Sequence, residues 1–244
     1  MARLPSQNIY DNPDFFAGYK TLRENPDNAV LQEEKPALFS LAPELTGKAV
    51  LDLGCGCGEN CAAFQQLGAS RVTGIDISAK MLAVAKAETH GINYIQMDMS
   101  DLSGLRGGYD VIFSSLALHY IADFNRLCAQ VAGLLHDGGH FVFSQEHPLS
   151  TAPLHGPSWT KDENGTRLHY NLSDYMRCGK RENTWIVDGV VKYHRTLSEL
   201  INALIDNGFV IRRLVESTPA HNEKRQHKPN FLLVKAQKRI GGPK

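Results

Sequence analysis

Three glycines and two acidic residues in the first third of the chain have the types and spacing of a ligand site. Gly54, Gly56 and Gly58 alternate at the end of the run Ala49-Val-Leu-Asp-Leu-Gly-Cys-Gly-Cys-Gly58, directly after a predicted buried strand. Glycine has no Cβ, so the backbone can turn sharply there and a ligand can approach the main chain closely. The helix expected after the turn adds free N–H donors and the positive end of its dipole. A polar or anionic group, such as part of a nucleoside-bearing cofactor, is expected to bind here.

The second acid, Asp76, lies 24 residues after Asp52, at the end of another predicted strand. A dinucleotide-binding turn has glycines at its first, third and sixth positions. The sixth position counted from Gly54 is Glu59, whose carboxylate would face a pyrophosphate. The pattern Asp-x-Gly-x-Gly-x-Gly instead resembles the first motif of the class I methyltransferases that use S-adenosylmethionine. A nicotinamide-dependent oxidoreductase stays open as an alternative that binding of NAD would test.

Four further motifs in the family's order extend the resemblance over residues 48–145: Arg71–Asp76, Asn93–Ser100, Tyr109–Ser115 and Gly138–Ser144. The resemblance implies that Asp76 binds both ribose hydroxyls and that Asp98 accepts a hydrogen bond from the adenine amino group. It also places Ile77 against the adenine, with Met81 nearby, and gives S-adenosylhomocysteine as the product. The predicted cofactor residues are Tyr19, Arg23, Asp52, Gly54, Gly56, Gly58, Asp76, Ile77, Met81, Asp98, Met99 and Ser114.

Some of these residues also have purely structural interpretations. Asp52 braces the glycine turn in one interpretation and contacts the methionine end of the cofactor through water in another. Tyr10 and Tyr19 are candidates for aromatic faces near the sulfonium, with ordinary packing as the alternative. Arg23 is a candidate partner for the methionine carboxylate, with a solvated surface position as the alternative.

Three histidines are candidate general bases, which are needed only if the acceptor's nucleophile must lose a proton. His119 lies just past the fourth-strand motif, His147 follows the fifth strand next to Glu146, and His194 lies beside Arg195. A histidine at the end of a strand is often only a hydrogen-bonded structural residue. The sequence leaves open whether any of the three acts as the base.

The elements that must position these residues alternate between strand and helix, as a doubly wound α/β sheet requires. The apolar positions of residues 124–135 repeat at helical spacing, and Gly138-Gly139 is expected to end that helix. Thr196-Leu-Ser-Glu199 is a predicted capping box at the start of the last helix. The resemblance implies a Rossmann-like methyltransferase fold with a seven-stranded, mostly parallel sheet and an antiparallel final strand.

Two regions outside the core motifs are expected to choose the substrate. The N-terminal region is predicted to hold a helix from about Asn28, with Pro36 inside it. In the second region, Trp185–Tyr193 is predicted to be a β-hairpin that turns at Asp188-Gly189. The single domain, 1–244, is divided into a cap segment (1–47), the cofactor-binding core (48–145), a substrate lid inserted between strand five and the last helix (146–195), and the C-terminal helix and strands (196–244).

Composition narrows the class of partner. The 26 basic and 26 acidic residues balance, so no overall field draws the chain to nucleic acid or membrane. We see no signal peptide and no apolar run of the roughly 20 residues that a membrane span needs, and we expect a cytoplasmic location. The five cysteines are interpreted as reduced thiols. No metal is expected, because Cys55, Cys57 and Cys61 lack the paired spacing of a zinc site.

Elimination favours a small-molecule methyl acceptor. The position after the fourth strand reads Ser114-Ser-Leu-Ala117 and lacks the Pro-Pro motif of base-amino DNA methyltransferases. No Pro-Cys pair suits cytosine C5 chemistry, and the chain is similar to the quinone- and biotin-pathway methyltransferases. An RNA or tRNA methyltransferase and a non-catalytic S-adenosylmethionine-binding protein stay as alternatives, and the oligomeric state is undetermined. The basic residues of the C-terminal part are interpreted as a solvated surface: Arg212, Arg213, Lys224, Arg225 and Lys228.

Overall fold

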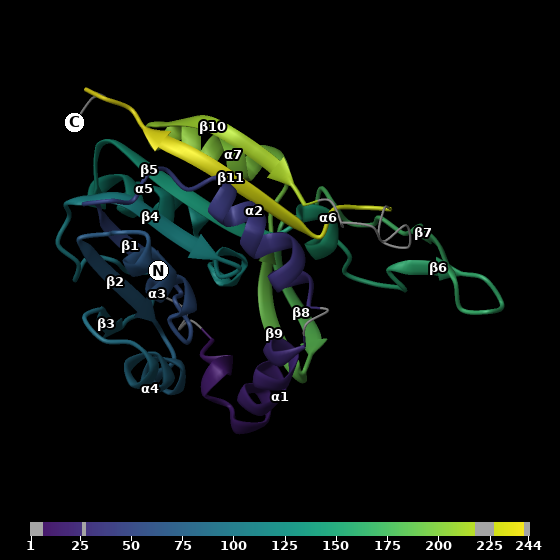
Figure 1. Ribbon diagram of the computed structural model, residues 1–244. Helices are drawn as coiled ribbons and strands as arrows, with labels where there is room; N and C mark the ends of the chain where they lie inside the picture. The colour runs from purple at the N-terminus through teal and green to yellow at the C-terminus, as the bar shows by residue number, and fades with distance from the viewer. Residues whose placement is uncertain (1–6, 26–27, 218–226, 242–244) are drawn as a thin grey trace.

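Seven strands form one central sheet in the order β10-β11-β5-β4-β1-β2-β3 (Figure 1). The computed structural model describes residues 7–25, 28–217 and 227–241, so Lys224 and Arg225 lie outside the described residues. β11 runs antiparallel to both of its neighbours, whereas the pairs among β1 to β5 are parallel. This confirms the predicted seven-stranded, mostly parallel sheet. The strands are β1 (Ala49–Leu53), β2 (Arg71–Asp76), β3 (Asn93–Gln96), β4 (Tyr109–Ser115), β5 (Leu135–Glu146), β10 (Phe209–Glu216) and β11 (Phe231–Lys238).

Helices cover both faces of the sheet because the central strands are apolar on both sides. In β4, Ile112 packs into one buried cluster with residues of α5 and α7. Its neighbours Val111 and Phe113 pack into a second cluster with residues of α2, α3 and α4. The helices and short helical turns before the insertion are η1 (Ile9–Asp11), α1 (Pro13–Glu24), η2 (Val30–Glu34), α2 (Lys35–Ser40), α3 (Glu59–Gln66), α4 (Ala79–Glu88), η3 (Leu118–Tyr120) and α5 (Phe124–Leu134); α6 (Pro148–Thr151) and α7 (Leu197–Asp206) follow β5 and β9.

Two predicted helix ends have different outcomes. The capping box is confirmed, since Thr196 Oγ1 accepts from the Glu199 N–H and the Glu199 carboxylate accepts from the Thr196 N–H. The prediction that Gly138-Gly139 ends α5 is wrong, because α5 ends at Leu134 and both glycines lie inside β5. The register of β4 and β5 shifts there, and a Cβ on Gly139 would lie 3.0 Å from the Asp110 carbonyl oxygen.

The helix predicted from about Asn28 is interrupted by a wider turn. Val30–Glu34 forms a π-helical turn, and α2 begins directly after it with Pro36 in its first turn. Proline has no N–H to donate to the preceding turn, which explains why the regular helix restarts at this point. The wide turn leaves both Glu33 and Glu34 buried.

The insertion after β5 forms two hairpins that lie outside the central sheet (Figure 1). They are β6 (Trp159–Lys161) with β7 (Arg167–Tyr170), and β8 (Gly179–Trp185) with β9 (Val187–His194). The predicted turn at Asp188-Gly189 is wrong, because Trp185 pairs with Val187 and the chain reverses at Ile186, which has a φ of 65°. Asp188 instead accepts a hydrogen bond from Thr184 Oγ1 at 2.5 Å inside an irregular part of the ladder.

No helix within the described residues is long and apolar enough to cross a membrane.

The capping box gives a stability prediction. Thr196→Ala removes the side-chain acceptor at the start of α7 and should lower the free energy of unfolding by about 1 kcal/mol, measured by urea denaturation. Thr196→Ser keeps the hydroxyl and is the matched control, which should stay close to the wild-type value. Equal loss in both variants would show that the methyl group, and not the cap, is what matters.

Candidate functional site

The glycine turn after β1 leaves backbone open to a cavity. Gly54, Gly56 and Gly58 all adopt positive φ angles, of 73°, 54° and 82°. A Cβ on Gly54 would lie 2.6 Å from the Ala117 Cβ, so that position also requires a close approach. A Cβ on Gly56 would meet no atom within 4 Å. Gly56 therefore exposes bare main chain, which fits close approach of a cofactor.

Asp76, at the end of β2, joins the glycine turn to the start of α4. Its Oδ2 accepts from the Gly56 N–H at 2.9 Å and its Oδ1 accepts from the Ser78 N–H at 2.8 Å. Ser78 caps α4 and donates to Asp11 Oδ1 at 2.6 Å, so the N-terminal segment is fastened at the same place. Burial raises the pKa of Asp76, while the two backbone donors oppose that change.

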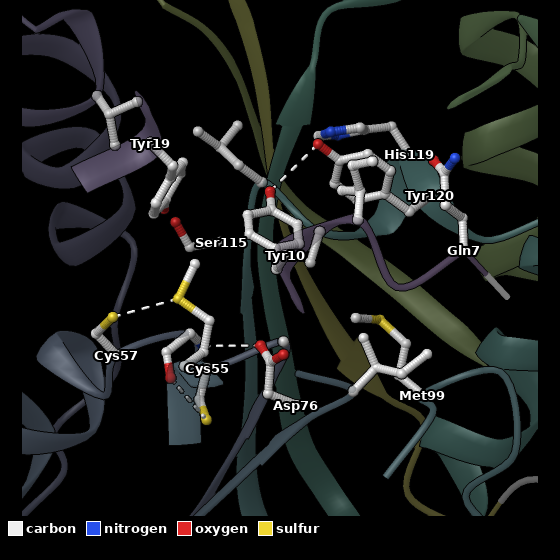
Figure 2. Close-up of a pocket in the computed structure, with 18 of the residues that line it drawn as sticks. Gln7, Tyr10, Tyr19, Cys55, Cys57, Asp76, Met99, Ser115, His119 and Tyr120 are labelled. Atoms are coloured by element: carbon white, nitrogen blue, oxygen red, sulfur yellow. Dashed lines mark hydrogen bonds between the residues drawn. The ribbon is translucent and has the colours of Figure 1, made fainter. Parts of the chain in front are cut away.

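One cavity of about 1280 Å³ extends from this turn along the carboxyl ends of the parallel strands. That edge is where open α/β sheets bind their ligands. Figure 2 shows Cys55, Cys57 and Asp76 in its lower half and Tyr10, Tyr120 and His119 above them. The predicted site residues that line the cavity are Tyr19, Arg23, Gly54, Gly56, Asp76, Ile77, Met81, Asp98, Met99 and His119.

Three predicted cofactor residues do not line the cavity: Asp52, Gly58 and Ser114. Asp52 is buried in β1, where Cys61 Sγ donates to its Oδ2 at 3.6 Å and burial raises its pKa to about 7. Gly58 is the N-cap of α3. Ser114 Oγ donates to the Leu53 carbonyl at 2.8 Å, so it links β4 to β1.

Two of the three candidate bases are engaged elsewhere. His147 caps α6 through Nδ1, and its Nε2 lies 2.9 Å from Glu216 Oε1. His194 is fully buried, with Nδ1 2.9 Å from Thr151 Oγ1 and Nε2 donating to the Tyr175 carbonyl at 2.8 Å. Neither lines the cavity, because each side chain turns back into the insertion or the edge of the sheet. Of the three candidate bases, only His119 lines the cavity.

His119 lies in η3, after β4, and lines the cavity although its side chain is buried. Its Nδ1 has no hydrogen-bond partner among the described residues. Burial lowers the pKa of His119 to about 4, with Lys192 and Arg195 acting in the same direction and Glu146 opposing them. The imidazole is therefore neutral at pH 7 and has a nitrogen lone pair to offer.

Aromatic side chains of the N-terminal segment and the second hairpin meet over the cavity. Trp185 of β8 packs edge-on against Phe15 and Tyr19 of α1, at centroid distances of 5.3 and 6.3 Å. Gln7 donates to the Gly189 carbonyl at 2.7 Å and accepts from the Val191 N–H at 2.9 Å. These contacts form a roof that joins the N-terminal segment to the second hairpin across the site.

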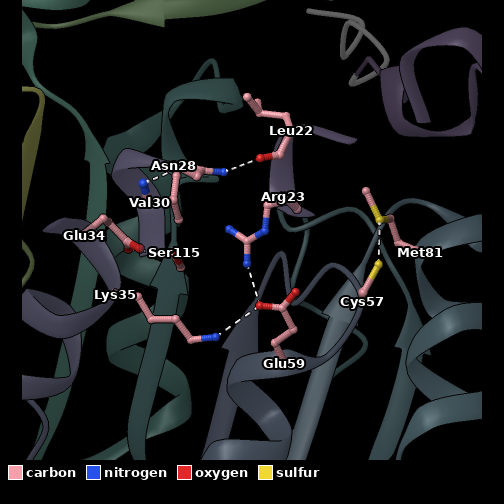
Figure 3. A network of polar contacts seen from close by, with 10 residues as sticks. All are labelled: Leu22, Arg23, Asn28, Val30, Glu34, Lys35, Cys57, Glu59, Met81 and Ser115. Atoms are coloured by element: carbon pink, nitrogen blue, oxygen red, sulfur yellow. Dashed lines mark hydrogen bonds and ion pairs between the residues drawn. The ribbon is translucent and has the colours of Figure 1, made fainter. Parts of the chain in front are cut away.

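Charged groups gather at the side of the cavity formed by α1, α2 and α3 (Figure 3). Arg23 donates to Glu59 Oε2 at 2.6 Å, and Lys35 Nζ donates to the same oxygen at 3.1 Å. Two cations therefore share the Glu59 carboxylate next to the glycine turn, and the buried carboxylate of Glu34 also acts electrostatically on both of them.

The carboxylate of Glu34 was not predicted from the sequence. Its Oε1 accepts from Ser115 Oγ at 2.8 Å and from Ser144 Oγ, and its Oε2 has no hydrogen-bond partner among the described residues. Ser144 Oγ also accepts from the N–H of Leu116, whose φ of 52° is unusual for leucine. Glu34 thus holds the ends of β4 and β5 where they reach the cavity. The only sequence signal was Pro36, which marks the wide turn that buries Glu34.

Comparison with known proteins places this geometry in a class. The family described as a methyltransferase domain matches residues 51–143. A solved S-adenosylmethionine-dependent methyltransferase from Mesorhizobium loti is 40% identical, covers 89% of this chain and all of its own, and superposes with a TM-score of 0.78. The class is therefore that of the methyltransferases.

More particularly, the chain belongs to the S-adenosylmethionine-dependent methyltransferases, and S-adenosylmethionine is its cofactor. This confirms the resemblance stated from the motifs. An uncharacterized protein of Haemophilus influenzae is 36% identical over 94% of this chain and 96% of its own length. A trans-aconitate 2-methyltransferase of Deinococcus radiodurans is 34% identical over 52% of this chain and 46% of its own.

The position of Asp76 predicts a binding defect. Asp76→Asn should weaken binding of S-adenosylhomocysteine roughly 10- to 150-fold, the effect of losing a hydrogen bond to a charged group. Titration calorimetry measures the affinity, and thermal melting checks that the variant folds. Asp206→Asn removes an exposed carboxylate of α7 and is the matched control. Unchanged affinity in a folded Asp76→Asn protein would remove Asp76 from the site.

The buried neutral state of His119 predicts a pH dependence of stability. Between pH 6.5 and 4 the unfolded chain binds a proton at this residue and the folded chain does not, so the wild type should lose stability as pH falls through that window. The pKa of about 4 corresponds to about 3 kcal/mol. Urea denaturation at pH 7 and pH 4.5 measures the free energy of unfolding. The loss between these two pH values should be smaller in His119→Gln than in the wild type. Parallel pH curves for the two proteins would contradict a buried, neutral His119.

Proposed function

We propose that the chain transfers a methyl group to a small-molecule acceptor that binds in the same cavity as the cofactor. The observation that carries this proposal is the size of the cavity, about 1280 Å³. Single ligand sites usually measure roughly 300–1,000 Å³. The cavity therefore has room for an acceptor beside the cofactor, which a protein that only binds the cofactor would not need.

The roof favours a small acceptor over a nucleic acid. Gln7 and Trp185 connect the N-terminal segment to the second hairpin across the cavity. A folded RNA would have to displace these contacts before a base reached the site, whereas a small molecule fits beneath them. The Deinococcus radiodurans relative is named for a small organic acid, trans-aconitate, which supports the same class.

We assign the cofactor's contacts to the residues at the glycine turn. Asp76 retains lone pairs that face the cavity and suit two ribose hydroxyls. The Arg23 guanidinium, which lines the cavity beside the glycine turn, suits the methionine carboxylate. When bound, S-adenosylmethionine supplies an electrophilic methyl group on a positively charged sulfur.

On the acceptor's side, His119 is the proposed general base. Its imidazole is neutral at pH 7, so it can accept a proton from a hydroxyl or amine without first losing one. Tyr10 and Tyr120, whose hydroxyl oxygens lie 3.3 Å apart, belong to the wall that keeps water out and holds the acceptor in line.

Methyl-transfer assays test this function. Purified protein is incubated with isotope-labelled S-adenosylmethionine and a panel of small hydroxy, amino and carboxylic acids, with bulk tRNA as the macromolecular comparison. Label should enter a small acceptor, and His119→Ala should lower kcat by roughly 10²- to 10⁴-fold with a smaller change in KM. His155→Ala, an exposed histidine outside the cavity, is the control and should keep its turnover.

Two outcomes would contradict the proposal. Transfer to tRNA and to none of the small acceptors would overturn the small-molecule class. Wild-type kcat and an unchanged pH profile in His119→Ala would be compatible with a small-molecule acceptor. They would show that His119 is not the general base.

A further inference from the structure

A second cavity, of about 450 Å³, adjoins the first under the inserted segment. Ala29, Glu146 and Phe231 line both cavities, so the two spaces meet at these residues. The proposed cofactor contacts lie around the glycine turn and do not use the second cavity. Its position suits a part of the acceptor that extends beyond the reacting atom.

Two cations from segments far apart in the sequence line this second cavity. The guanidinium of Arg167, in β7, lies 4.6 Å from the ring centroid of Trp159. Lys228 Nζ, from the segment before β11, lies 5.1 Å from the Tyr170 centroid and donates to Ser150 Oγ at 2.7 Å. Within the described ranges, no hydrogen bond or ion pair engages the Arg167 guanidinium. Its planar set of N–H donors is therefore available to a ligand.

Two acidic groups, Glu146 and Glu33, act electrostatically on Lys228, and each also has a further partner. Glu146 forms an ion pair with Lys192 at 2.5 Å, and Glu33 accepts from Asn230 Nδ2 at 3.1 Å. Arg167, Lys228 and Lys192 together carry one more charge than these two carboxylates. Lys228 is also partly buried, although the sequence pattern had assigned it to a solvated surface. Among the described residues, the second cavity thus has a net positive charge, and an aromatic ring packs against each of its two cations, Trp159 against Arg167 and Tyr170 against Lys228.

We propose that Arg167 and Lys228 bind an anionic group of the methyl acceptor, a carboxylate or a phosphate, in the second cavity. The inference rests on the proposed function, because the acceptor's nucleophile would then lie in the first cavity, beyond Glu146. A guanidinium beside an ammonium suits the several oxygens of either anion. A neutral analogue of the same shape would leave the Arg167 guanidinium without an anionic partner, so the pair favours acidic acceptors.

Tryptophan fluorescence tests anion binding without knowledge of the acceptor. The chain has two tryptophans, so Trp185→Phe leaves Trp159 as the single reporter, next to Arg167. Acetate and inorganic phosphate are titrated at constant ionic strength, with acetamide as a neutral analogue of acetate. We expect a saturable change with at least one anion and none with acetamide, and the anion that binds more tightly identifies the source of the charge.

Charge-removing variants in the same background locate the site. Arg167→Gln and Lys228→Gln should each raise the anion's Kd roughly 10-fold, the effect of losing a charge-assisted hydrogen bond. Arg177→Gln removes an exposed positive charge of the insertion that does not line the second cavity, and should change Kd less than twofold. An absent response to both anions, or an equal loss of affinity in Arg177→Gln, would overturn the proposal.

Methyl transfer separates this inference from the proposed function. Acceptors found with the panel are compared as carboxylates and as their amides, and Arg167→Gln should lower kcat/KM for the carboxylates alone. Equal turnover of acid and amide would overturn the anion site and leave the small-molecule function standing. If no small acceptor is methylated, the proposed function fails, and the anion titration still decides whether the second cavity binds an anion.

Discussion

The site depends on one buried carboxylate that accepts two backbone N–H groups. Asp76 receives one hydrogen bond from the glycine turn after β1 and one from the first turn of α4. Gly54 and Cys55 of the turn donate to the Ile75 carbonyl at 2.9 Å, and Asp76 holds the next residue, Gly56. Ser78 then carries the connection to Asp11, which places the aromatic N-terminal segment over the cavity. The glycine turn and the roof of the cavity are therefore linked through the end of one strand, β2.

A second buried acid, Glu34, also connects separate segments. It lies at β4 and β5, on the other side of the point between β4 and β1 where the strand order reverses. It receives the hydroxyls of Ser115 and Ser144 and ties together the ends of β4 and β5. Burial raises its pKa and its serine partners oppose that change. Burying an acidic side chain without hydrogen-bond partners costs free energy. The wide helical turn before Pro36 places the Glu34 carboxylate within hydrogen-bonding distance of the two serines. The two acids fix the strand ends between which the cavity opens.

The parts of the structure that follow from local sequence were predicted, and the parts that depend on distant partners were not. The glycine turn, Asp76 and Asp98 could be placed because parallel strands bring their carboxyl ends to one edge of the sheet. His119, His147 and His194 looked equivalent, since only the fold shows which side chain points into the cavity. Lys228 acquires its setting from an insertion far earlier in the chain, donating to Ser150 over 78 residues, which no local pattern reveals.

The amide of Gln7 also bears on the open edge of the second hairpin. It donates to Gly189 and accepts from Val191, two residues apart on the outer side of β9, much as a peptide group of a neighbouring strand would. A two-stranded ribbon has open edges that can template pairing with other chains. One side chain thus occupies two of the polar groups that such pairing would use. The contact that closes the site therefore also guards the ribbon against addition of a foreign strand.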